Sequence, residues 1–271
     1  MCEHCGCAIT EPPSAAVPGG PATGAQDVEV VQVMSNLLAE NDAMAAHNRE
    51  HFDAHGVLVI NLMSSPGAGK TALLERTAEA LGGKLSFAVI EGDLATENDA
   101  QRIRAKGVPA VQITTGSACH LDARMVHHAL DALPLAGLDV LFIENVGNLV
   151  CPASFDLGQH LDVTLLSVPE GDDKPQKYPV MFRTADALLI TKTDLLPLLP
   201  EFEPRRAQAS LRALASDAPV LHVSCRSSEG VQPWCLWLEA ALADHRAAKV
   251  SGTAQSSTQP PVAEHEHRAA Y

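Results

Sequence analysis

The sequence is poor in positive charge and contains no long hydrophobic run. Its 19 Lys and Arg residues are outnumbered by 33 Asp and Glu residues, which gives a formal net charge of −14. An acidic chain does not offer the basic surface that nucleic acids or anionic membranes attract. No apolar stretch approaches the roughly 20 residues of a membrane span, and the first residues lack the pattern of a signal peptide. We therefore expect a cytoplasmic protein without a nucleic-acid or membrane partner.

Cysteines are few, seven in 271 residues, and their positions are uneven. Three of them, Cys2, Cys5 and Cys7, fall within the first seven residues. In a reducing compartment such thiols serve more often as ligands, nucleophiles or buried side chains than as disulfides. The hydrophobic content of 46% is ample for the core of one large domain or two small ones.

Composition divides the chain into three parts. Residues 1–26 combine the cysteine cluster with a stretch rich in Pro, Gly and Ala, which predicts a flexible metal-binding tail. Residues 27–247 are predicted to form the folded domain, which starts with a helix over 27–54. Residues 248–271 are dominated by Ser, Thr, Gln and Pro, so we expect a disordered tail.

Short apolar runs alternate with helical patterns through the domain. Strands are predicted at 57–63, 85–90, 110–113, 140–143, 163–168, 187–190 and 220–223, and helices near 71–82, 96–106, 121–132, 203–215 and 231–246. Near-continuous apolar strands of this kind are typical of an α/β fold with a mostly parallel sheet that helices cover on both faces.

A phosphate-binding loop is predicted directly after the first strand, in the run Ser64-Ser-Pro-Gly-Ala-Gly-Lys-Thr71. Gly67, Ala68 and Gly69 can curl their backbone N–H groups around phosphate oxygens, and the helix that follows adds a positive dipole end. Lys70 can reach the terminal phosphates, and the hydroxyl of Thr71 can bind Mg²⁺. Ser64 replaces the usual first glycine, a mild departure. Strand, loop and helix in this order predict a P-loop NTPase rather than a chance loop.

Two acidic residues follow predicted strands. Asp93 lies just after the strand at 85–90, and Glu144 just after the strand at 140–143. Ligands of such sheets bind at the carboxyl ends of the strands, and Mg²⁺ prefers oxygen ligands. We therefore assign Lys70, Thr71, Asp93 and Glu144 to phosphate and Mg²⁺ chemistry; acidic strand ends without a metal are the alternative.

The segment Thr191-Lys-Thr-Asp194 favours guanine over adenine. The carboxylate of Asp194 can accept two hydrogen bonds from the guanine base, and Lys192 can lie along base and sugar. The segment resembles the Asn-Lys-x-Asp motif of GTPases, with Thr191 in place of Asn. Ser224 and Cys225 resemble the last base-contacting loop of the same fold, so GTP is the expected nucleotide.

A second metal site is predicted from Cys119, His120 and Cys151. The first two follow a strand, and Cys151 follows the Glu144–Gly147 segment that is expected to sense the γ-phosphate. Thiolate and imidazole suit Zn²⁺ or Ni²⁺ rather than Mg²⁺. A single Cys is more often a small buried residue, so the prediction depends on the cluster.

Together these motifs resemble the HypB family, nickel-handling GTPases of hydrogenase maturation. The resemblance covers roughly residues 55–245 and the extreme N-terminus. It includes Glu91-Gly-Asp93, Cys119-His-Leu-Asp122, Glu144-Asn-Val-Gly-Asn-Leu149, Cys151-Pro152 and Glu170-Gly-Asp-Asp-Lys-Pro175, beside the cysteine cluster and the phosphate-binding loop. It implies that the trio Cys119, His120 and Cys151 is the metal site of the GTPase domain, at a GTP-dependent homodimer interface. It also implies nickel delivery to the hydrogenase large subunit precursor with the zinc protein HypA.

The resemblance also implies a nickel site at Cys2, Cys5 and Cys7. Three sulfurs and the terminal nitrogen would suit square-planar Ni²⁺, although His4 or a backbone amide could be the fourth ligand. A flexible tag that binds whatever metal is present is the alternative.

Two other functions remain open. The related urease nickel GTPases share the fold but carry Cys-Pro-His in place of Cys119-His-Leu-Asp122, and a nickel or zinc storage and sensing protein would not turn over GTP. His47, His51 and His55 align on one helix face, which permits metal storage, but we favour a solvated face. His127, His128, His265 and His267 receive no role.

Overall fold

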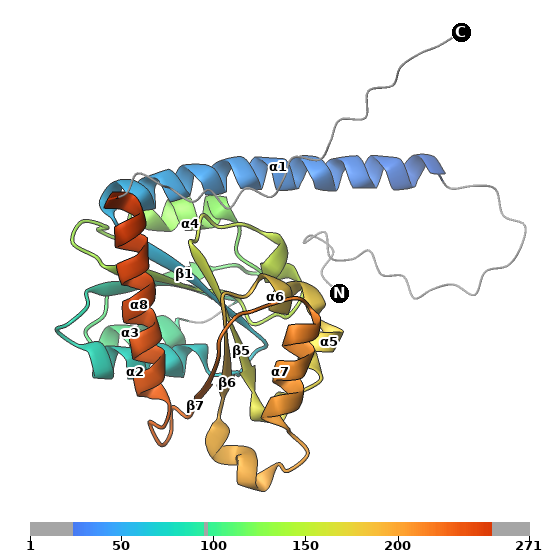
Figure 1. Cartoon of the computed structure of the whole chain (residues 1–271). Helices are drawn as coiled ribbons and strands as arrows, with labels where there is room; N and C mark the ends of the chain where they lie inside the picture. Colours follow the sequence, from blue (N-terminus) through green and yellow to red (C-terminus); the bar gives the residue numbers. More distant parts are fainter. Residues whose placement is uncertain (1–23, 95–96, 251–271) are drawn as a thin grey trace, which may run out of the picture.

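The computed structural model describes residues 24–94 and 97–250, and within them seven strands form one sheet (Figure 1). The strand order is β3-β2-β4-β1-β5-β6-β7, and every neighbouring pair is parallel. The strands are β1 Leu58–Ser64, β2 Phe87–Asp93, β3 Ala110–Thr114, β4 Val140–Glu144, β5 Leu161–Ser167, β6 Ala187–Thr191 and β7 Val220–Val223. The predicted P-loop NTPase architecture, a mostly parallel sheet between helices, is confirmed.

Helices cover both faces of the sheet and connect most consecutive strands, whereas only a 3-10 turn lies between β4 and β5 (Figure 1). They are α1 Gly24–His55, α2 Lys70–Leu81, α3 Asn98–Ala105, α4 Ala123–Leu130, α5 Lys174–Lys177, α6 Pro179–Thr184, α7 Pro204–Ala213 and α8 Val231–Val250, with 3-10 turns η1 Cys151–Ser154, η2 Val168–Glu170 and η3 Thr193–Leu198. Because strand side chains alternate between faces, β1 sends Leu58, Ile60 and Leu62 toward α2, α3 and α8, and sends Val59 toward α1 and α4. Met63 packs with α6 and α7.

The second strand lies further along the chain than predicted. It was expected at 85–90 and spans Phe87–Asp93, so Glu91 and Asp93 belong to the strand rather than to the loop after it. Parallel pairing then places Glu91 directly opposite Glu144 of β4. An acidic residue in an apolar strand ends the hydrophobic pattern early, which explains the shifted boundary.

The long helix α1 lies beside α4 and projects past the body of the domain (Figure 1). Near its carboxyl end Phe52 is fully buried, and Asn41 and Asn48 are buried as well. Asn41 accepts a hydrogen bond from the backbone N–H of Ala123, and Asn48 donates one to the carbonyl of the same residue. The first residue of α4 is therefore held by two side chains of α1.

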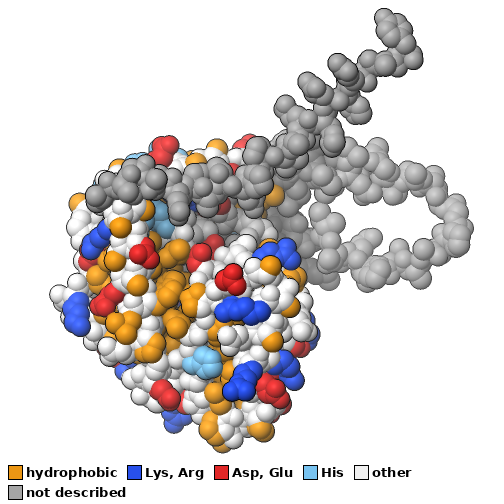
Figure 2. All heavy atoms as spheres, viewed as in Figure 1, with side chains coloured by type: hydrophobic (Ala, Val, Ile, Leu, Met, Phe, Trp, Pro, Cys, Tyr) orange, Lys and Arg blue, Asp and Glu red, His pale blue; other side chains and the backbone are white. Residues whose placement is uncertain are grey.

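The surface agrees with the acidic composition. On the described part of the face in Figure 2, basic and acidic side chains are interspersed rather than gathered into a basic patch. None of the helices within the described residues combines the length and the apolar character that crossing a bilayer requires. The predicted N-terminal site at Cys2, Cys5 and Cys7, with the linker through residue 23 and the tail beyond residue 250, lies outside the described residues.

Candidate nucleotide and metal site

The loop between β1 and α2 has the backbone of a phosphate cradle. Gly67 and Gly69 adopt positive φ angles of 74° and 103°, a conformation that side chains disfavour. A Cβ atom added to either glycine would meet no atom within 4 Å, so the loop has open space beside these backbone N–H groups. Lys70, only 8% exposed, donates from Nζ to Oγ of Ser64 at 3.1 Å. The serine that replaces the first glycine thus holds the lysine across the loop.

Gly147 packs directly against this loop. A Cβ on Gly147 would lie 2.7 Å from the Cα of Pro66, closer than a side chain can approach. The segment after β4 is therefore in backbone contact with the phosphate-binding loop.

Thr71, Glu144 and Glu91 form a buried oxygen cluster beside the loop. The hydroxyl of Thr71 donates to Oε1 of Glu144 at 2.8 Å. Glu91 and Glu144 are 2% and 3% exposed, and the Oε2 atom of each lacks a hydrogen-bond partner among the described residues. Buried carboxylate oxygens without donors are expensive unless a cation satisfies them, so this donor set fits Mg²⁺.

The protonation of the two carboxyls reflects the same crowding. Burial, and then the neighbouring Glu144, raise the pKa of Glu91 to about 11. Burial also raises the pKa of Glu144, although the charge of Lys70 acts in the opposite direction. Two acids this close share a proton unless a divalent cation neutralises them, as expected for a cation site rather than a structural pair.

Asp93 ends β2 on the same side as Glu91, two residues further along the strand. Its Oδ1 accepts a hydrogen bond from the backbone N–H of Leu94 at 2.6 Å. Gly92 between them has no room for a side chain, because a Cβ would lie 2.8 Å from Leu121. The metal loop that contains His120 therefore packs on the strand that carries the predicted Mg²⁺ residues.

The predicted base-binding residues meet at the other end of the loop. The hydroxyl of Ser224, which is fully buried, donates to Oδ1 of Asp194 at 2.7 Å and fixes that carboxylate. Lys192 adopts a left-handed conformation with φ 56°, which turns the chain from β6 into η3. Thr191 donates from Oγ1 to the carbonyl of Ala68 at 2.6 Å. Thr191 thus anchors the phosphate loop itself, although it lacks the amide of the usual motif.

Cys225 is positioned by its backbone rather than by its thiol. Its carbonyl accepts a hydrogen bond from Nε of Arg76 on α2 at 2.7 Å. Burial raises the pKa of the Cys225 thiol to about 11, so the thiol stays protonated and is a poor metal ligand. This separates Cys225 from the predicted metal-binding cysteines.

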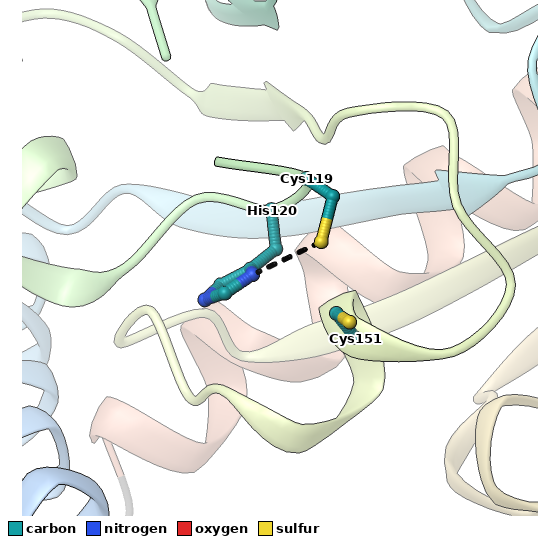
Figure 3. Close-up of side chains that lie close together, drawn as sticks. All are labelled: Cys119, His120 and Cys151. Carbon is teal, nitrogen blue, oxygen red and sulfur yellow. Dashed lines mark hydrogen bonds between the residues drawn. The ribbon is translucent and has the colours of Figure 1, made fainter. Parts of the chain in front are cut away.

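The structure brings Cys119, His120 and Cys151 together. One ligand atom from each lies within 4.8 Å of the other two, and Sγ of Cys119 is 3.8 Å from Nδ1 of His120 (Figure 3). Cys119 and His120 come from the loop before α4, whereas Cys151 begins η1 after β4. Two thiols and one imidazole from two segments are a soft three-donor set that leaves a coordination position for a further ligand.

His120 is prepared for this role by its surroundings. Its ring stacks on Phe155 with centroids 3.9 Å apart, and the residue is only 8% exposed. Burial lowers the pKa of His120, although Asp122 acts in the opposite direction. The imidazole is therefore held neutral and in a fixed plane, as metal binding requires.

Two asparagines connect the metal trio to the phosphate loop. Asn145 donates to Oδ1 of Asn61 on β1, and its own Oδ1 accepts the backbone N–H of Leu121. Asn148 donates its backbone N–H to the carbonyl of Ser64 at 2.8 Å and its side-chain amide to the carbonyl of Cys119 at 3.2 Å. The strand that ends in the phosphate loop thus shares hydrogen-bonded residues with the segments that carry Cys119 and Cys151.

Sequence reasoning placed these site residues but missed several supporting ones. Glu91, Asn145, Asn148 and Phe155 were not singled out as functional. Glu91 could have been recognised as an acidic residue that interrupts an apolar strand, and the two asparagines lie inside the quoted motif Glu144–Leu149. Phe155 gives no sequence signal, because only the folded chain brings it onto His120.

Comparisons with known proteins agree with this geometry. Residues 58–222 match the family "CobW/HypB/UreG, nucleotide-binding domain". The chain is 53% identical over 218 residues to the hydrogenase maturation factor HypB of Azotobacter vinelandii, which covers 80% of this chain and 72% of the relative. It is 48% identical over 221 residues to HypB of Escherichia coli K12, covering 82% of this chain and 76% of the relative.

A solved structure gives the same result in three dimensions. HypB from Helicobacter pylori in complex with nickel is 44% identical and superimposes with a TM-score of 0.73, over 76% of this chain and 96% of that structure. The family match covers more than half of the chain, and the identities are near 50% over most of each relative. Both findings support the same family assignment. The chain belongs to the HypB family of hydrogenase maturation factors, within the CobW/HypB/UreG nucleotide-binding proteins.

Proposed function

We propose that this protein is a GTP-hydrolysing nickel metallochaperone that supports nickel insertion into the large subunit of a [NiFe]-hydrogenase. The observation that carries the proposal is the link between two sites. Asn148 bonds to the carbonyl of Ser64, at the start of the phosphate loop, and to the carbonyl of Cys119 in the metal trio. A nucleotide site built onto a soft-metal site is suited to transfer of a metal ion that depends on nucleotide state.

GTP is the proposed nucleotide because of Asp194. Ser224 holds one oxygen of this half-buried carboxylate, which supports the proposal that Asp194 accepts the two N–H donors of guanine. Adenine offers no such pair. Gly67, Ala68 and Gly69 bind the phosphates through backbone N–H groups, and Lys192 and Cys225 border the base.

In the proposed hydrolysis, Lys70 would neutralise charge on the terminal phosphates, and Thr71, Asp93 and Glu144 would hold a Mg²⁺ ion, with Glu91 as an additional buried neighbour. Mg²⁺ supplies electrostatic stabilisation of the phosphates. Turnover is expected to be slow, since a switch needs long-lived states rather than flux.

Nickel is the proposed cargo of Cys119, His120 and Cys151, with Zn²⁺ as a competitor. A homodimer that forms with GTP would bring two such trios together. Val150, directly before Cys151, is 59% exposed and could lie in that interface. The proposed partners are a HypA-type metallochaperone and the hydrogenase large subunit precursor, with nickel loading at Cys2, Cys5 and Cys7.

The function is tested by complementation and by turnover. A strain that lacks the gene is expected to lose hydrogenase activity, to regain it with excess nickel, and to be rescued by the wild-type gene but not by Lys70→Ala. The purified chain is expected to hydrolyse GTP with Mg²⁺ and not ATP. Loss of urease rather than hydrogenase activity would favour the urease-type alternative, and metal binding without GTP turnover would favour storage or sensing.

A further inference from the structure

Three histidine rings meet where α1 packs on α4, away from the nucleotide and metal site. His47 and His51 lie one turn apart on α1, and His127 lies on α4. Their ring centroids are 4.8 Å apart for His47 and His51, 5.2 Å for His47 and His127, and 6.0 Å for His51 and His127. We expected His47 and His51, with His55, to form a solvated helix face, and we assigned no role to His127.

These separations suit one shared ion. Imidazoles bound to a tetrahedral metal at nitrogen distances of about 2.0–2.1 Å have ring centroids roughly 5 Å apart. The structure does not place the ring nitrogens of all three residues within 4.8 Å of one another. The exposed rings of His47 and His51 would therefore have to rotate toward His127, which is half-buried and held by Asn48. The i, i+4 spacing on one helix keeps the first two rings on the same face.

The tautomer of His127 can be worked out from its neighbours. Nδ2 of Asn48 donates to the carbonyls of Ala123 and Leu157, at 2.8 and 3.1 Å, which fixes the orientation of the amide. Oδ1 of Asn48 must then be the acceptor in its 3.1 Å contact with Nδ1 of His127. With the proton on Nδ1, Nε2 keeps its lone pair for a metal. A buried amide that orients a histidine in this way is the usual support of a metal ligand.

We propose that His47, His51 and His127 form a binding site for a divalent transition-metal ion, with Zn²⁺ and Ni²⁺ as the ions to probe. Three neutral imidazoles suit both ions. The two exposed rings leave the remaining coordination position to water or to a donor from another molecule. The site is separate from Cys119, His120 and Cys151 and does not need nucleotide.

The same tautomer argument excludes a metal site at a second cluster within the described residues. Ligand atoms of Asp53, His160 and His245 lie within 4.8 Å of one another. However, the backbone N–H of Val59 donates to Nδ1 of His160 at 2.9 Å, so the neutral ring carries its proton on Nε2. That nitrogen lies 3.6 Å from Oδ1 of Asp53 and, because it carries the proton, has no lone pair for a metal.

The location of the site suggests what an ion there would do. α4 begins three residues after His120, and Asn41 and Asn48 of α1 already hold its first residue. An ion bound between His47, His51 and His127 would add a further connection between the two helices, beside these hydrogen bonds and the contact of Asn48 with His127. It would thereby stiffen the helix that follows the Cys119–His120 loop.

The test measures Zn²⁺ and Ni²⁺ binding by calorimetry on the full chain with Cys2, Cys5, Cys7, Cys119 and Cys151 changed to Ser, which removes the thiolate sites. We expect one equivalent of metal whose affinity falls at least about tenfold in each of His47→Gln, His51→Gln and His127→Gln. His55→Gln and His128→Gln are matched controls on the same two helices and should keep the parent affinity.

Two results would overturn the proposal. One is metal binding that is absent in the parent or unchanged in all three ligand variants. The other is a loss in His55→Gln or His128→Gln as large as in His47→Gln, which would indicate adventitious binding to surface histidines. Because His47 and His51 are exposed, their variants are expected to fold, and circular dichroism without metal checks this. Visible absorption of the Co²⁺-loaded parent should show tetrahedral nitrogen ligation without a thiolate charge-transfer band.

Discussion

Thr191 stands where the guanine motif of related GTPases carries Asn, and its hydroxyl bonds to the carbonyl of Ala68 in the phosphate loop at 2.6 Å. Both groups are buried, so removing the hydroxyl would leave a carbonyl without a partner. We expect Thr191→Val to weaken GDP binding by about 1–2 kcal/mol, roughly five- to thirtyfold in Kd.

The control for this prediction is the nearby Thr193. Thr193→Val removes a hydroxyl for which the structure gives no hydrogen bond to the phosphate loop, and it should leave the Kd for GDP nearly unchanged. Thr191→Asn should restore most of the affinity if the amide reaches the same carbonyl. Equal Kd values for the wild type and Thr191→Val, measured by fluorescent GDP titration, would contradict the anchoring role.

At the residue scale the grouping of the candidate metal ligands could be predicted better than the residues that support them. Cys119, His120 and Cys151 were grouped from their sequence context, and the structure brings their ligand atoms together. Glu91 received no role, because an acidic residue after an apolar run indicates the end of a strand rather than a buried position within it. The Nε2 lone pair of His127 could not be inferred at all, since it depends on hydrogen bonds of Asn48 across 75 and 109 positions in the chain.

At the scale of elements, His160 connects the start of β5 to α1 and α8. Its ring lies 4.4 Å from that of His245 on α8, measured between centroids, and its Nε2 is 3.6 Å from the carboxylate of Asp53 on α1. Burial, and then the charge of His245, lower the pKa of His160 from its usual 6.5 to about 4. Burial lowers the pKa of His245 as well.

The sign of the resulting pH dependence follows from proton counts. Between about pH 6.5 and about pH 4 the unfolded chain protonates His160 and the folded chain does not, so stability falls as the pH falls. The gap between the two pKa values corresponds to about 3 kcal/mol. His160→Asn keeps an acceptor for the N–H of Val59 but cannot titrate, so it should lose less stability on acidification.

Urea unfolding at about pH 7 and about pH 4.5 measures how much stability the wild type and His160→Asn each lose on acidification. Comparing the two losses cancels the titration of the carboxylates that both proteins share. His55→Asn, an exposed histidine near the same end of α1, should behave as the wild type. The interpretation is wrong if His160→Asn loses as much stability on acidification as the unmodified chain.

Element positions followed from hydrophobic periodicity wherever a strand or helix had a buried face. All seven strands were predicted, and β7 matches to the residue. The short helices α5 and α6 were not predicted, because they span four and six residues with proline near each start. Runs of that length are too short to show a helical period.

At the scale of the whole molecule, the two sites behave as one unit if nucleotide state moves the metal-binding segments. Gly147 contacts Pro66 with no room for a Cβ, and Asn148 bonds to both Ser64 and Cys119. A γ-phosphate that shifts the phosphate loop therefore shifts the segment leading to Cys151. We expect the Ni²⁺ affinity of the trio to differ between the GTP-bound and GDP-bound protein.

This coupling is measured by Ni²⁺ titration in both nucleotide states, on the chain with Cys2, Cys5 and Cys7 changed to Ser so that only the trio reports thiolate binding. By linkage, the factor by which GTP changes Ni²⁺ affinity must equal the factor by which Ni²⁺ changes GTP affinity, which provides an internal check.

Asn148→Ala should bring the ratio of the Ni²⁺ affinities in the GTP-bound and GDP-bound states toward one, because it removes the amide that holds Cys119. Gln176→Ala removes a comparable amide, bonded to Ser210 between α5 and α7, and should leave the ratio unchanged. Identical Ni²⁺ affinities in the two states of the parent chain would show that the metal trio and the nucleotide site are adjacent but not energetically coupled.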